Sequence, residues 1–94
     1  MILRKQGMNA KHKNTLKKLF AVPLRPGIAW TDIEGLLKAL GADISEGAGS
    51  RVRISLNGVR AAFHRPNPHK ETDKGARQSM RRFLREAGVL DDAL

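Results

Sequence analysis

The sequence predicts an α+β domain in which two helices cover one face of a three-stranded antiparallel sheet. Three observations predict it. An Asn-Gly pair joins two alternating runs within residues 51–64, one amphipathic segment precedes these runs, and another follows them. An antiparallel sheet with one apolar face is stabilised by helices packed on that face. The order helix, three strands, helix is that of double-stranded-RNA-binding-like folds, with an added helical arm at the N-terminus.

The first helix is predicted over residues 9–20, inside a basic arm that we place at residues 1–29. Leu16, Leu19 and Phe20 fall at i, i+3 and i+4, and lysines occupy the positions between them. Pro23 ends the helical pattern. The remaining residues, 30–94, form the predicted α-β-β-β-α domain.

The second helix begins near residue 31 and ends at Gly41. Thr31 and Glu34 predict a capping box, and Gly41 suits the positive φ that follows a helix end. The apolar positions recur with helical spacing at Ile33, Leu36, Leu37 and Leu40. A short strand around Ile44, at residues 42–46, is predicted next.

The hairpin over residues 51–64 turns at Asn57-Gly58, a pair that favours a two-residue turn with positive φ at both positions. This turn places Leu56 opposite Val59, and it builds one apolar face, because side chains alternate across a strand. The other face then carries Arg51, Arg53, Ser55, Arg60, Ala62 and His64. Arg51 is predicted to lie directly opposite His64.

The last helix is predicted to open near Thr72-Asp73 and to stop at Gly88. Its buried stripe comprises Ala76, Met80, Phe83, Leu84 and Ala87. Arg77, Arg81 and Arg85 follow one another at i, i+4 and i+8, and we expect them on its exposed side.

The net charge of +9 favours an anionic partner: nucleic acid, an acidic protein or a membrane surface. A spanning helix is excluded, because no apolar run approaches about 18 residues. The chain has no cysteine, and its three histidines are too scattered for a metal site. We therefore expect a cytoplasmic protein without cofactor, metal or membrane partner.

Four features in order resemble the HicA family of bacterial toxins, over residues 30–89. They are the helix of residues 32–37, Gly49-Ser50 at the second strand, the loop of residues 66–70, and the final helix from Lys74-Gly75 to Gly88-Val89. The resemblance implies a small cytoplasmic ribonuclease that cleaves messenger RNA and a HicB antitoxin that blocks it. Family members usually read Gly-Ser-His where this chain reads Gly49-Ser50-Arg51, and that histidine is the catalytic one.

RNA cleavage without a metal needs a proton-transferring group and cations that stabilise the charge developing on the phosphate. Histidine suits the proton transfer and arginine the phosphate. We therefore predict His64 and Arg51 as the catalytic pair. The predicted RNA-binding residues are Arg53, Arg60, Arg65, His69, Lys70 and Arg77. No tyrosine is present, so binding should be electrostatic rather than through base stacking.

Two functions of different class follow. The chain is either a HicA-like nuclease toxin, or a catalytically inactive module of the same fold that binds RNA or its antitoxin. An architectural DNA-binding protein is a third interpretation, which no helix-turn-helix pattern favours. The basic arm is open to several interpretations: a second RNA contact, an antitoxin-docking element, a solvated tail or a transit peptide.

Overall fold

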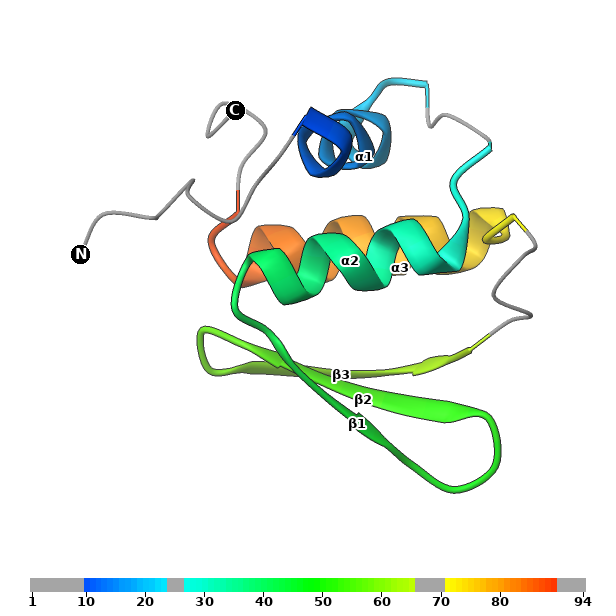
Figure 1. Ribbon diagram of the computed structural model, residues 1–94, viewed down its shortest axis with the longest axis vertical. Helices are drawn as coiled ribbons and strands as arrows, with labels where there is room; N and C mark the ends of the chain where they lie inside the picture. The colour runs from blue at the N-terminus through cyan, green and yellow to red at the C-terminus, as the bar shows by residue number, and fades with distance from the viewer. Residues whose placement is uncertain (1–9, 24–26, 66–70, 90–94) are drawn as a thin grey trace.

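The computed structural model describes residues 10–23, 27–65 and 71–89, and it shows three layers (Figure 1). The sheet is the first layer, two neighbouring helices cover one of its faces, and the N-terminal helix lies across the far side of those helices. The elements are α1 (Ala10–Phe20), α2 (Trp30–Ala39), β1 (Asp43–Glu46), β2 (Arg51–Leu56), β3 (Val59–His64) and α3 (Lys74–Glu86). The predicted α-β-β-β-α fold is confirmed.

The sheet has the strand order β1-β2-β3, with both pairs antiparallel. Its register is the predicted one: Leu56 lies opposite Val59, and Arg51 lies opposite His64. The turn between them has positive φ at both positions, +53° at Asn57 and +82° at Gly58. The Asn57 side chain also donates a 2.7 Å hydrogen bond to the carbonyl of Ala87, which ties the turn to the end of α3.

One hydrophobic core joins all three layers. Val52, Ile54 and Phe63 rise from the sheet into α2 and α3, and the Phe63 ring lies 6.0 Å from that of Trp30 and 6.2 Å from that of Phe83. The arm contributes to the same cluster through three buried side chains of α1, namely Leu16, Leu19 and Phe20. Helix α1 therefore packs on the domain through its apolar stripe.

The start of α2 differs from the prediction. Ala29 is the N-cap residue, with extended backbone and no side-chain cap, and Trp30 is the first helical residue. The Glu34 carboxylate accepts a 2.6 Å hydrogen bond from Trp30 Nε1 instead of returning to a backbone amide. The capping box prediction is therefore wrong. The physical reason is that Ala29 pairs as a β-bridge with Glu71, which places the N-cap two residues before Thr31.

The start of α3 is as expected, because Asp73 Oδ1 accepts a 2.8 Å hydrogen bond from the amide of Ala76.

The arginine stripe of α3 is not the exposed face that was predicted. Arg77 is buried, and half-buried Arg81 donates through Nε to the carbonyl of Leu19 at 2.7 Å. Only Arg85 of the three is exposed. The prediction failed because Arg81 is bound at the end of α1 and Arg77 is bound by the residues just before α3.

Candidate nucleic-acid interface

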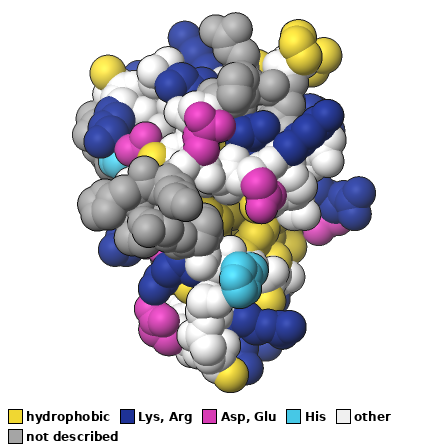
Figure 2. All heavy atoms as spheres, turned by 90° about the vertical axis from the view of Figure 1, so that its right-hand side faces the viewer, with side chains coloured by type: hydrophobic (Ala, Val, Ile, Leu, Met, Phe, Trp, Pro, Cys, Tyr) yellow, Lys and Arg dark blue, Asp and Glu magenta, His cyan; other side chains and the backbone are white. Residues whose placement is uncertain are grey.

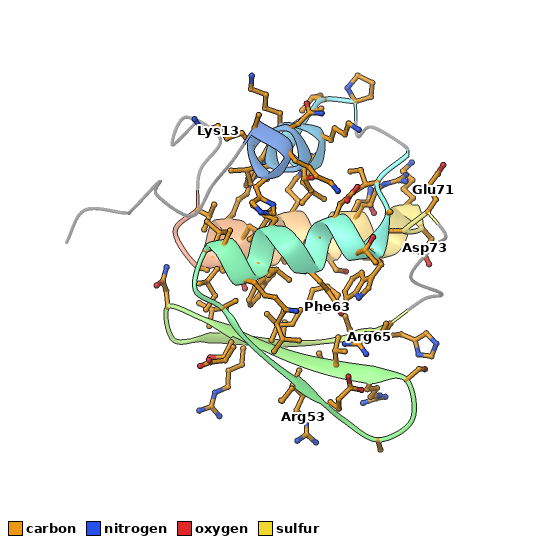
Figure 3. All side chains as sticks on the ribbon, in the orientation of Figure 1. Lys13, Arg53, Phe63, Arg65, Glu71 and Asp73 are labelled. Carbon is orange, nitrogen blue, oxygen red and sulfur yellow. The ribbon has the colours of Figure 1, made fainter. Side chains whose placement is uncertain are left out.

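The outer face of the sheet, which we define by Arg51, Arg53, Ser55, Arg60, Ala62 and His64, points away from all three helices. Strand alternation places these side chains opposite the core, and all of them are exposed except Ser55, which is half-buried. Figure 3 shows Arg53 projecting from the sheet on the side away from the helices. Strand β1 adds Asp43 opposite Ser55 and Ser45 opposite Arg53. The face is thus a continuous polar surface across all three strands.

An open hollow of about 550 Å³ lies on this outer face. Two arginines and one carboxylate line it together with serines and small or apolar residues: Arg53, Arg60, Asp43, Ser45, Ser55, Ile54, Ala61 and Ala62. Serine hydroxyls donate and accept hydrogen bonds, and guanidinium groups donate only. The lining suits an anionic ligand that also carries hydroxyl groups.

The three arginines of the outer face keep their charge available. Within the described parts of the chain, no carboxylate forms an ion pair with Arg51, Arg53 or Arg60. Asp43 of β1 lies on the same face, and Ser55 separates it from Arg60 across the sheet. Among the described residues, Asp43 and Arg60 form no ion pair. Because an exposed guanidinium can donate two parallel hydrogen bonds to a phosphate, these arginines can each hold one phosphate group.

Arg51 and His64 lie side by side at one end of this face. The amide of Arg65 donates to the carbonyl of Ser50 at 2.8 Å, so residues 50 and 65 form a hydrogen-bonded pair of the ladder. Pairs alternate along antiparallel strands, which makes Arg51 and His64 a non-hydrogen-bonded pair. Side chains of such pairs are the closer ones, with Cβ atoms about 4.5–5.5 Å apart. A single phosphate can therefore meet the guanidinium and the imidazole together.

Ser50 holds the imidazole in place from the end of β2. Its Oγ lies 3.2 Å from both ring nitrogens of His64, and the tautomer decides which partner donates. Neither residue is buried. The histidine is thus oriented by a neighbour and still open to a ligand.

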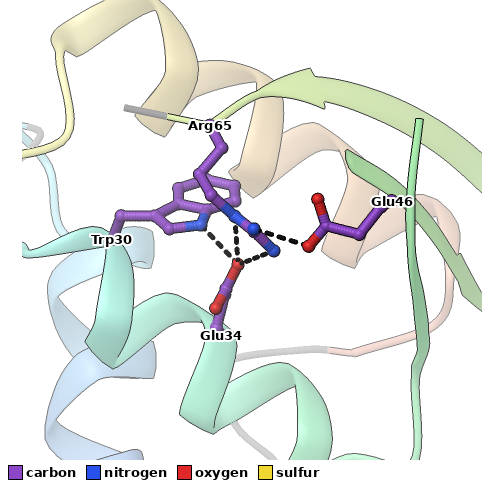
Figure 4. Close-up of polar contacts among 4 residues, drawn as sticks. All are labelled: Trp30, Glu34, Glu46 and Arg65. Carbon is purple, nitrogen blue, oxygen red and sulfur yellow. Dashed lines mark hydrogen bonds and ion pairs between the residues drawn. The ribbon is translucent and has the colours of Figure 1, made fainter. Parts of the chain in front are cut away.

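Arg65 leaves the sheet on the opposite side, toward the helices. Its Nε and Nη2 lie 3.0 and 2.9 Å from Glu34 Oε2, and its Nη1 lies 2.7 Å from Glu46 Oε2 (Figure 4). The hydrogen bond to Glu46 raises the pKa of Arg65; burial lowers it, and the charge and hydrogen bond of Glu34 raise it further. This arginine, predicted to bind RNA, is bound by two carboxylates.

Arg77 is likewise held by the protein. It is buried, it donates through Nη1 to the carbonyl of Thr72 at 2.9 Å, and the same nitrogen lies 3.9 Å from Glu71 Oε1. The other two predicted RNA contacts, His69 and Lys70, lie outside the described residues. The structure thus brings together Arg51, Arg53, Arg60 and His64, and it places Arg65 and Arg77 elsewhere.

The family match decides what kind of protein carries this surface. A model described as the HicA toxin of bacterial toxin–antitoxin systems matches residues 30–89, which is more than half of the chain. The chain belongs to the HicA toxin family. Comparison with curated proteins and with solved structures finds no match. As a member of this family, the protein is the toxin of a toxin–antitoxin system and has an antitoxin as its partner.

The HicA region runs from α2 to the residue after Gly88, so α1 precedes it. This region contains the entire outer face, including Arg51 at the position where the family resemblance expects histidine. His64 is the cross-strand partner of that position. An imidazole is therefore still present at this end of the sheet, one strand away from the expected place.

Sequence reasoning missed the cluster of Trp30, Glu34, Glu46 and Arg65 that joins α2, β1 and the end of β3. A signal was available, because alternation from buried Phe63 places Arg65 on the inner side of the sheet. Its carboxylate partners come from residues 19 and 31 positions away, and no spacing rule predicts those.

The described residues contain neither a metal-binding cluster nor a membrane-spanning helix. No group of three His, Cys, Asp or Glu side chains within this part of the protein is arranged to hold a metal ion. None of the helices in it has the length and apolar character needed to cross a membrane.

Proposed function

We propose that this HicA-family toxin is a metal-independent endoribonuclease that cleaves messenger RNA in the cytoplasm and is neutralised by a HicB-like antitoxin. The observation that carries the proposal is the Arg51–His64 pair on an exposed and cationic face. A nuclease of this kind needs an imidazole within reach of a bound phosphate, and the cross-strand register supplies it.

In the proposed reaction, the 2′-oxygen of a ribose attacks the adjacent phosphorus and the bond from phosphorus to the 5′-oxygen breaks. His64 accepts the proton of the 2′-hydroxyl, and the resulting imidazolium returns a proton to the departing 5′-oxygen. Arg51 neutralises the charge that develops on the non-bridging oxygens. The products are a 2′,3′-cyclic phosphate and a free 5′-hydroxyl, so no water is consumed in this step.

Binding of the RNA strand is assigned to the unpaired arginines. Arg53 and Arg60 lie further along the same face than the Arg51–His64 pair, and they line the hollow on it. Arg65 and Arg77 already donate to protein groups, so they carry no part of this proposal. A contact from His69 or Lys70 stays a prediction from the sequence.

The antitoxin is proposed to act by covering this same face. Three exposed cations without an internal carboxylate partner attract an acidic protein surface as well as RNA. A HicB-like protein bound there would exclude the phosphate from Arg51 and His64. Inhibition would then require no change in the toxin fold.

The decisive experiment measures cleavage of a purified oligoribonucleotide, with and without a chelator, by wild type and His64→Ala. We expect chelator-resistant cleavage by wild type and a loss of about 10²–10⁴-fold in His64→Ala, the usual range for an acid–base group. His64 is exposed, so the variant should keep the wild-type melting temperature. Undiminished cleavage by a folded His64→Ala variant would remove His64 from the reaction.

A second candidate function rests on the one position where this chain differs from the Gly-Ser-His motif expected of the family. Arg51 stands where the family resemblance expects the catalytic histidine, which favours a module that binds RNA or antitoxin without cutting. Binding of the oligoribonucleotide without cleavage by wild type would select this function. Arg51→His is expected to restore or raise cleavage if the rest of the family site is present.

A further inference from the structure

We propose that the pocket between β3 and α3 is a binding site for one nucleobase of the RNA strand, next to the phosphate that is cut. This inference rests on the proposed function and deepens it by naming a base-reading subsite. The pocket has a volume of about 300 Å³ and is lined by Ala62, Phe63, His64, Asp73, Ala76 and Ser79. Figure 2, which looks onto this end of the molecule, shows hydrophobic side chains lying open between a histidine and acidic side chains.

The pocket lies where the edge of β3 meets the first turn of α3, and small residues line it from both elements. Ala62 comes from β3 and Ala76 from the first turn of α3, and neither fills the space between the two elements. Beneath them the buried ring of Phe63 is fixed against Trp30 and Phe83. The site is therefore preformed, with an apolar floor that does not have to rearrange.

The shape and chemistry of this pocket fit a base. About 300 Å³ is at the small end of ligand pockets, enough for one planar ring system and too small for a folded peptide segment. A base has apolar faces for the alanines and phenylalanine, and a polar edge for the rim. That rim is formed by the Asp73 carboxylate and the Ser79 hydroxyl.

The position of the pocket connects it to the cationic face. His64 forms part of its wall, and Ala62 lines both this pocket and the hollow that contains Arg53 and Arg60. A strand whose phosphates lie on the outer face can therefore place a base over the edge of β3, into the pocket, with its phosphate beside His64. The negative charge of Asp73 directs the base rather than the phosphate to this side.

Asp73 predicts which bases are preferred. One carboxylate oxygen, Oδ1, caps α3 at the amide of Ala76, and Oδ2 has no hydrogen bond within the described residues. A carboxylate accepts hydrogen bonds only, so it favours a base edge with an amino group. Cytosine and uracil differ at this edge by an amino group against a carbonyl, so the pocket should favour cytosine.

The test uses 2′-O-methyl hexamers of cytidine and of uridine, which cannot be cleaved, and measures their affinities by fluorescence anisotropy. For wild type we expect cytidine binding about tenfold tighter than uridine binding, the value of one hydrogen bond to a charged group. Asp73→Asn keeps the helix cap, because asparagine caps equally well, and presents an amide in place of the carboxylate. It should bring the affinity ratio close to one.

Ala76→Leu fills the pocket from the side of α3, leaves Arg51 and His64 unsubstituted, and should weaken binding of both hexamers about tenfold. Gln78→Leu is the matched control, because it adds the same side chain at an exposed position of α3 that does not line the pocket. Amide shifts of Ala76 and Ser79 on adding cytidine hexamer locate the site.

Equal binding of the two hexamers by wild type, or a wild-type ratio in Asp73→Asn together with wild-type affinities in Ala76→Leu, would overturn the base pocket. If wild type nevertheless cleaves RNA, only the pocket proposal fails and the nuclease proposal stands. If wild type binds neither hexamer, both proposals fail. Asp73→Asn gives the answer even if Ala76→Leu does not fold.

Discussion

The arginines of the hairpin and the arginines of α3 have the same chemistry and opposite surroundings. Arg51, Arg53 and Arg60 are exposed and have no ion-pair partner among the described residues. Arg77 and Arg81 donate to backbone carbonyls of the protein itself. The difference shows that a basic residue in this chain is available to a ligand only where no other layer covers it.

The covering layer is α1. Its C-terminal carbonyls have no partner within the helix, as at any helix end, and Arg81 donates to that of Leu19 and to that of Ala21, the residue after α1. Arg85 adds a guanidinium 5.6 Å from the centre of the Phe20 ring. Arg81 and Arg85 of α3 thus attach the N-terminal helix, whereas the arginines of the hairpin are left for a partner.

The largest effect on stability is expected from Arg81→Met, which keeps the apolar stem of the side chain and removes its donors. Two half-buried carbonyl groups of α1 lose a charged donor, so the free energy of unfolding should fall by about 2–3 kcal/mol. Urea denaturation measures it. RNA affinity should stay within twofold of wild type; a stable variant with weakened RNA binding would reverse the assignment of this arginine.

Arg65→Met is expected to lower the free energy of unfolding by about 1–2 kcal/mol. Glu34, whose side chain is 20% exposed, would lose its cation, whereas Glu46 at 68% is largely solvated, which limits the cost. Because the pKa of Arg65 is raised in the folded protein, its contribution to stability is complete below the pKa of the unfolded state and is lost only as the pH rises through the higher folded value.

The loss of unfolding free energy in Arg65→Met should therefore be the same at pH 6 and pH 9, because the guanidinium carries its charge at both pH values. Denaturant midpoints of wild type and variant at the two pH values measure it. Glu46→Gln is the matched control and should cost less than Arg65→Met. An Arg65→Met variant as stable as wild type would mean that the two carboxylates do not hold the end of β3.

Arg85→Gln should have the smallest effect, about 0.5–1 kcal/mol, because it removes one exposed cation from an aromatic face. Thermal unfolding of Arg85→Gln and of Arg81→Met under the same conditions compares the two losses of stability. A loss as large as that of Arg81→Met would show that the ring contact, rather than the carbonyl contacts, attaches α1 to α3.

The sheet was predictable from the sequence because its determinants are local. Asn57-Gly58 sets the turn, and strand alternation then fixes every partner from Leu56 to His64. The Asp73 cap and the positive φ of Gly41 are local as well. The pairing of Arg51 with His64, which carries the candidate site, follows from the same short-range rules.

The features that could not be predicted depend on contacts between distant segments. The stripe on α3 has the spacing of a solvated face, and only the packing of α1, some 60 residues earlier, shows that Arg81 is bound. The capping box at Thr31 and Glu34 satisfied the local pattern, yet Glu34 is used by Trp30 and Arg65. Local rules could not decide between these competing partners.

The central claim, that the outer face of the sheet holds the RNA phosphates, is tested most directly by removing two of its cations. Arg53→Gln/Arg60→Gln is compared with Lys38→Gln/Arg82→Gln, which removes two exposed cations from the helices. Affinity for an uncleavable 2′-O-methyl oligonucleotide is measured over a range of salt. We predict that the first variant binds at least about tenfold more weakly and that its logarithmic salt slope falls by about 1.4, at about 0.7 per phosphate, while the second variant resembles wild type. Equal losses in the two variants would contradict the account, because binding would then depend on net charge and not on this face.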